Sequence, residues 1–170
     1  MKKILIVGLG NMLLQDEGAG IHILDQLREE GDLPKTVELV YGETGGLAIL
    51  PILDTAAVII FVDAMEFDGA AGETKVLRGG EIFSSDETLI SMHEVGLREI
   101  VSRILLAKDT STEIVLVGIK PKELGTGLQL SLEVEKAVPE IVGIIKREVA
   151  AQQKAGRKTN ARNLSFAKPC

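Results

Sequence analysis

Short runs of apolar residues alternate along the chain with longer segments in which apolar residues recur every three or four positions. The first pattern is typical of buried strands and the second of helices that bury one face. The apolar runs predict strands at residues 4–7, 37–41, 58–62 and 114–119. The periodic segments predict helices at residues 18–30, around Pro51, at 93–105 and at 134–149. Strands that alternate with helices indicate an α/β fold with a mostly parallel sheet.

Three local features refine this picture. The run at 58–62 is apolar at every position, which predicts a strand buried on both faces in the middle of the sheet. A short β-like piece at 74–77, within a glycine-rich segment, predicts an antiparallel edge strand or a hairpin. Ser91 and Glu94 have the spacing of a capping box, which puts His93 in the first turn of a helix.

The length of 170 residues fits one domain, which we place at residues 1–150. Residues 151–170 contain five basic residues and no acidic one, and we predict a flexible basic tail there. Subtracting these five charges from the net charge of −6 leaves −11 for residues 1–150. An acidic body with 3% aromatic residues and no tryptophan argues against a nucleic-acid partner.

Apolar segments of the length required for a membrane span, roughly 18 residues, do not occur, and the N-terminus has no signal-peptide pattern. We therefore predict a cytoplasmic protein without a membrane partner. The single cysteine, Cys170, excludes a disulfide framework or a thiolate metal cluster within the chain. The sequence shows no long exposed apolar stripe, and we expect a monomer.

A glycine-rich loop, Gly8 to Gly20, follows the first predicted strand and leads into the first predicted helix. Such a junction in an α/β protein usually faces a ligand. The loop could be read as the G-x-G-x-x-G fingerprint of a nucleotide-binding Rossmann-like protein, but Leu13 stands at the third glycine position. Asp16 and Glu17 near the helix start would repel a pyrophosphate. The loop therefore favours another ligand.

Glu17 follows the first predicted strand, Asp63 ends the third, and His93 begins a helix. The carboxyl ends of parallel strands share one edge of a sheet, so the two carboxylates are expected at the same edge. Two carboxylates and an imidazole suit a divalent ion such as Ni²⁺, Zn²⁺ or Mn²⁺. Asp16 competes with Glu17 for this role, and His22 is interpreted as a structural or surface residue.

Five segments together resemble the hydrogenase maturation proteases, the C-terminal processing endopeptidases of [NiFe] hydrogenase large subunits. These segments are G-x-G-N-x-L-x-x-D-E-G-x-G at residues 8–20, Thr44-Gly45-Gly46, Val62-Asp63-Ala64, Met92-His93-Glu94 and Gly118-Ile119-Lys120-Pro121. With the residue pattern, the resemblance implies a three-layer helix/sheet/helix sandwich. Its twisted sheet would have about five mostly parallel strands and one antiparallel edge strand.

The resemblance further implies that Glu17, Asp63 and His93 contact Ni²⁺ supplied by the precursor of a hydrogenase large subunit. The implied reaction removes the C-terminal extension of that precursor after nickel insertion, with Asp16, Glu17 or Asp63 as the group that activates water. Other divalent cations are expected to substitute in vitro. Lys120 replaces a glutamine common in the family, so substrate contacts near it are expected to differ. A nickel-handling protein without peptidase activity is the other alternative.

Overall fold

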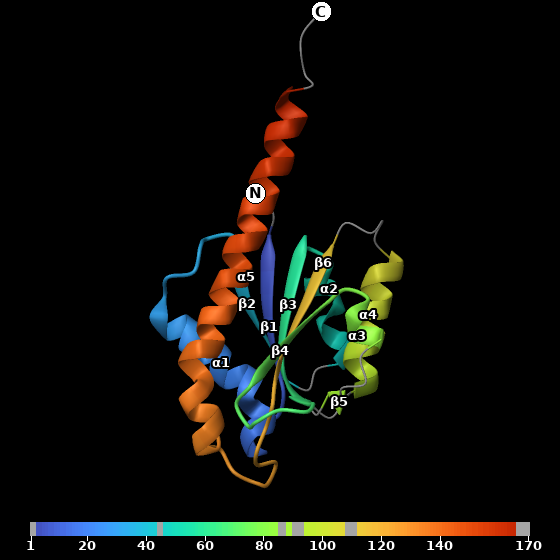
Figure 1. The fold of residues 1–170 in the computed structure, drawn as a ribbon. Helices are drawn as coiled ribbons and strands as arrows, with labels where there is room; N and C mark the ends of the chain where they lie inside the picture. The colour runs from blue at the N-terminus through green and yellow to red at the C-terminus, as the bar shows by residue number, and fades with distance from the viewer. Residues whose placement is uncertain (1–2, 44–45, 85–87, 90–93, 108–111, 166–170) are drawn as a thin grey trace, which may run out of the picture.

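The computed structural model describes residues 3–43, 46–84, 88–89, 94–107 and 112–165. A mixed sheet lies at its centre, with the strand order β2-β1-β3-β6-β4 (Figure 1). These strands are β1 (Ile4–Leu9), β2 (Val37–Glu43), β3 (Val58–Glu66), β4 (Thr74–Arg78) and β6 (Glu113–Ile119). β4 alone on this path is antiparallel to its neighbour, β6. The prediction of a mostly parallel sheet with one antiparallel edge strand is confirmed.

Strand β3 is longer than its sequence pattern predicts. Its apolar run ends at Val62, but the strand continues through Asp63 to Glu66. The extension exists because Met65 and Glu66 pair antiparallel with the two-residue strand β5 (Thr88–Leu89). The prediction that the strand ends at Asp63 is therefore wrong, and Asp63 is an interior position of the strand.

Helices cover both faces of the sheet and give the predicted three layers (Figure 1). One face packs against α1 (Ala19–Glu30) and α5 (Leu132–Ser165), with a core that includes Ile6, Leu24 and Ile145. The opposite face packs against α4 (Glu94–Ala107), with Phe61 and Val101 in its core. The short helices α2 (Leu50–Leu53) and α3 (Glu81–Ser84) accompany α4.

Local sequence signals account for the ends of α1. Its buried stripe of Ile23, Leu24 and Leu27 has the predicted helical period. Gly31 ends the helix in the left-handed conformation, with φ 63°, and its N–H donates to the carbonyl of Leu27. At the other end, the 3₁₀ helix η1 (Gln15–Gly18) connects the glycine-rich loop to α1. A second 3₁₀ helix, η2 (Gly46–Ile49), leads into α2.

Helix α5 continues to Ser165, well beyond the predicted boundary at residue 150. Figure 1 shows its last turns extending past the sheet. Residues 151–165 are therefore helical, which differs from the irregular tail expected from their polar sequence. The flexibility of this segment and the domain boundary stay predictions. Among the helices that the structure describes, none combines the length and apolarity that a membrane crossing requires.

Candidate functional site

Two glycines bring the loop after β1 against the central strands. Gly10 has φ +122°, a conformation that L side chains rarely adopt, and a Cβ there would lie 1.8 Å from the carbonyl oxygen of Glu17. A Cβ at Gly20 would lie 2.3 Å from the carbonyl oxygen of Val62. The glycine spacing thus serves close backbone packing of η1 and α1 on β1 and β3, and this packing determines where Glu17 lies.

Glu17 lies in η1, which contacts β3. The residue is only 6% exposed, and its Oε1 atom has no hydrogen-bond partner within the part of the chain that the structure describes. Burying a carboxylate oxygen without a partner is costly in free energy. Such an oxygen is therefore available to a cation, to a proton or to a hydrogen-bond donor of a ligand.

Asp63 is fully buried in the interior of β3. It pairs with Gly118 of β6, the residue before the strand leaves the sheet at Ile119. Gly20, three positions after Glu17, packs against the carbonyl of Val62, the neighbour of Asp63. The structure therefore places Glu17 and Asp63 on elements that touch at one edge of the sheet.

Asp16, the competitor of Glu17, has a different environment. Its Oδ2 accepts hydrogen bonds from the backbone N–H groups of Lys122 (2.8 Å) and Glu123 (2.9 Å) and from the hydroxyl of Ser131 (2.7 Å). Its Oδ1 accepts one from the backbone N–H of Ser131 at 2.7 Å. Asp16 is fully buried, and both of its oxygens are engaged by residues 122–131. This geometry favours Glu17 over Asp16 as the group that meets a ligand.

The third predicted site residue, His93, lies outside the described residues, as do Ser91 and Met92 of the predicted capping box. Helix α4 begins at Glu94 in the structure. Within the described ranges, no group of three His, Cys, Asp or Glu side chains could hold a metal ion. The meeting of Glu17, Asp63 and His93 therefore stays a prediction.

The segment from residue 120 to 131 is a part of the site region whose contact with the glycine-rich loop was not predicted from the sequence. Lys120 forms an ion pair with Glu66, the last residue of β3. Beyond it, Gln15 donates a backbone hydrogen bond to Gly127 (2.9 Å), and Gly127 donates one to Leu13 (2.9 Å). The loop that leads to Glu17 is thus bonded to a second loop more than 100 residues later in the chain. Asp16 is the acidic residue that makes much of this contact, but its hydrogen-bond partners could not be identified from the sequence.

Comparisons with known proteins agree on one family. A family model described as HycI, hydrogenase maturation protease, matches residues 21–148, which include Asp63 and His93. The hydrogenase 2 maturation protease of Escherichia coli is 31% identical over 137 residues, which are 80% of this chain and 84% of that protein. The hydrogenase expression/formation protein HupD of Rhodobacter capsulatus is 30% identical over 125 residues, 72% of this chain. The match spans only 59% of that relative's length.

Solved structures extend the similarity to the fold. The hydrogenase maturating endopeptidase HybD of Escherichia coli superposes with a TM-score of 0.75 at 29% identity, covering 91% of this chain and 94% of that one. The [NiFe] hydrogenase maturation protease HybD of Thermococcus kodakarensis gives a TM-score of 0.73 at 28% identity, covering 86% and 99%.

Proposed function

The chain belongs to the hydrogenase maturation protease family, and we propose on this basis that it is an endopeptidase acting on a [NiFe] hydrogenase large-subunit precursor. The reaction is hydrolysis of one peptide bond, which releases the C-terminal extension of the precursor after nickel insertion. The precursor is the partner, and the enzyme works as a monomer in the cytoplasm.

The buried carboxylate of Glu17 is the observation that supports this proposal. Its Oε1 atom has no partner among the described residues, and η1 holds it against β3, which carries Asp63. A buried carboxylate of this kind is stabilised by a cation or by a hydrogen-bond donor that arrives with a ligand. An acidic, water-excluding edge of this kind suits both cation contact and proton transfer.

We assign Glu17, Asp63 and His93 to contact with the nickel ion that the precursor carries. Carboxylate oxygen and imidazole nitrogen are suitable donors for Ni²⁺, and a substrate-bound ion gives the enzyme a means to recognise only nickel-loaded precursor. A divalent ion can also polarise a carbonyl group. Contact through three side chains would orient the scissile bond over the edge of the sheet.

The chain's own residues then supply the proton transfer. Hydrolysis requires a water molecule to attack the scissile carbonyl and a group to accept a proton from that water. Glu17 and Asp63 are the candidates for this general base. Asp16 is the weaker candidate, because its two oxygens already accept four hydrogen bonds from residues 122–131.

Mass spectrometry of the precursor tests this proposal. We expect the purified protein to shorten the C-terminus of nickel-loaded precursor and to leave metal-free precursor intact. Glu17→Gln and His93→Ala are expected to abolish cleavage, whereas Glu29→Gln, on an exposed position of α1, is expected to retain it. Calorimetry gives a readout other than cleavage, with tighter binding of nickel-loaded than of metal-free precursor. Equal cleavage of both precursors would refute nickel recognition, and full activity of His93→Ala would remove that residue from the site.

A further inference from the structure

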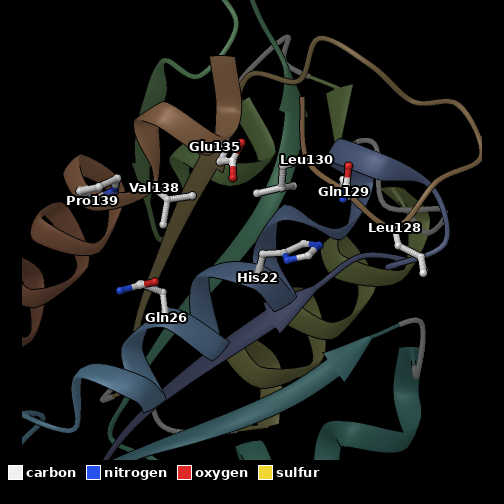
Figure 2. Close-up of a pocket in the computed structure, with 8 residues that line it drawn as sticks. All are labelled: His22, Gln26, Leu128, Gln129, Leu130, Glu135, Val138 and Pro139. Atoms are coloured by element: carbon white, nitrogen blue, oxygen red, sulfur yellow. The ribbon is translucent and has the colours of Figure 1, made fainter. Parts of the chain in front are cut away.

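A pocket of about 640 Å³ opens beside the candidate site, on the face of the sheet that α1 and α5 cover. Its walls come from His22 of α1, from residues 128–130, and from Glu135, Val138 and Pro139 of α5 (Figure 2). Figure 2 shows the imidazole of His22 on the side of α1 that faces residues 128–130. Residues 128–130 belong to the segment 120–131 beside Glu17, whereas His22 and the α5 residues have no part in the site described above.

The pocket lies a short distance from Glu17. Gly127 and Ser131 flank the pocket's residues 128–130, and they bond to Gln15 and Asp16, the two residues before Glu17. The wall of the pocket is therefore attached to the segment that carries Glu17. A substrate whose scissile bond lies at Glu17 has this pocket beside its neighbouring residues.

The loops between Glu17 and the pocket expose leucine side chains. Leu13 and Leu128 are each 62% exposed and Leu124 is 44% exposed, on loops that the backbone bonds between Leu13, Gln15 and Gly127 hold together. The four hydrogen bonds to Asp16 fix the same segment from the other side. Exposed apolar side chains on a fixed backbone beside a site are typical of a binding surface that is already ordered before its ligand arrives.

One polar group of the pocket is suited to a peptide backbone. The Nε2 atom of His22 is buried and has no hydrogen-bond partner in the described part of the chain. An extended peptide offers N–H and C=O groups to such an atom, and Leu130 and Val138 offer an apolar wall to its side chain.

We propose that this pocket and Leu128 at its rim hold the polypeptide of the protein substrate next to the scissile bond. The bound segment is extended, places an apolar side chain against Val138 and makes a hydrogen bond with His22. This inference rests on the proposed endopeptidase function and adds a substrate-binding subsite to it. The subsite contributes to affinity for the precursor, and the bond-breaking step does not use it.

Steady-state cleavage of nickel-loaded precursor by four variants tests the subsite. Leu128→Ser and His22→Leu are expected to raise KM about tenfold each, a loss of about 1.4 kcal/mol of binding, with kcat changed less than about twofold. His22→Gln, which keeps a hydrogen-bonding group, is expected to recover most of the affinity. Leu106→Ser is the matched control, because Leu106 is an 84% exposed leucine on α4, and its KM should equal that of the wild type.

A crosslinking measurement covers the case in which a variant folds poorly. A photoreactive residue at position 128 should crosslink to the precursor close to its cleavage site, and the same residue at position 106 should not. Unchanged KM in both pocket variants, or equal crosslinking from both positions, would overturn the subsite while cleavage by the wild type leaves the endopeptidase function standing. Absence of cleavage and of binding by the wild type would overturn both.

Discussion

Gly20→Ala tests whether close backbone packing positions the site. The added Cβ would lie 2.3 Å from the carbonyl oxygen of Val62 and 2.4 Å from that of Leu9. Ordinary contacts begin near 3.4 Å, so the start of α1 must move away from β1 and β3 by about 1 Å. Both oxygens belong to the backbone of buried strands, which cannot yield as a flexible side chain does. We expect the free energy of unfolding to fall by about 1–3 kcal/mol.

The same movement displaces Glu17, which precedes Gly20 by three residues, relative to Asp63. A misplacement of about 1 Å in a catalytic arrangement can lower the rate about a hundredfold. Urea denaturation measures the first effect, and mass spectrometry of nickel-loaded precursor measures the second. We expect kcat for precursor cleavage to fall more than the stability loss alone explains, because the folded fraction stays high in the absence of urea.

Gly143→Ala is the matched control, since it is also a glycine-to-alanine change within a helix. The nearest atom to a Cβ at Gly143 is the end of the flexible Arg147 side chain, at 3.4 Å. Alanine favours the helix over glycine by roughly 0.5–1 kcal/mol, so this variant should be as stable as the wild type or more so, with full activity. The reasoning is refuted if Gly20→Ala matches Gly143→Ala in both stability and activity.

Two further predictions concern the surroundings of the site. Asp16→Asn replaces one oxygen that accepts hydrogen bonds from the N–H groups of residues 122–131 by an NH₂ group, which can only donate. We expect the free energy of unfolding, measured by urea denaturation, to fall by about 2–4 kcal/mol. An unchanged denaturation midpoint would contradict the structural role of Asp16. Burial raises the pKa of the Tyr41 hydroxyl, and the hydrogen bond that it donates to Asp25 raises it further. The contribution of the Tyr41 hydroxyl to stability is therefore complete below about pH 10, its pKa in the unfolded chain. This contribution is lost as the pH rises through the pKa of Tyr41 in the folded protein. Tyr41 is the only tyrosine and tryptophan is absent, so the absorbance of the phenolate reports this pKa directly, and a native value equal to the unfolded one would contradict the assignment.

The elements of the core could be predicted from the sequence because their signals are local. Residues 114–119 of strand β6 form an unbroken buried run, and α1 combines a buried stripe with a glycine cap at Gly31. Helix α5 was predicted too short because residues after Val149 lack an apolar stripe. Their alanine, glutamine, lysine and arginine residues nevertheless favour a helix, so the helix continues although the apolar stripe has ended.

The candidate site could be predicted only in part. The position of Glu17 follows from a loop between a strand and a helix, which the glycine pattern reveals. The choice between Glu17 and Asp16 could not be made, because Asp16 is occupied by residues 122–131, more than 100 positions away. The extension of β3 beyond Asp63 depends on pairing with β5, a strand of two residues that leaves no sequence signal.

Anomalous diffraction from crystals soaked in a nickel salt tests most directly whether the three predicted ligands share one cation. We predict a single peak at the carboxyl edge of β1 and β3, within about 2.0–2.3 Å of an oxygen of Glu17, an oxygen of Asp63 and a ring nitrogen of His93. A nickel peak at another place, or side chains of these three residues on separate surfaces of the crystal structure, would contradict the account.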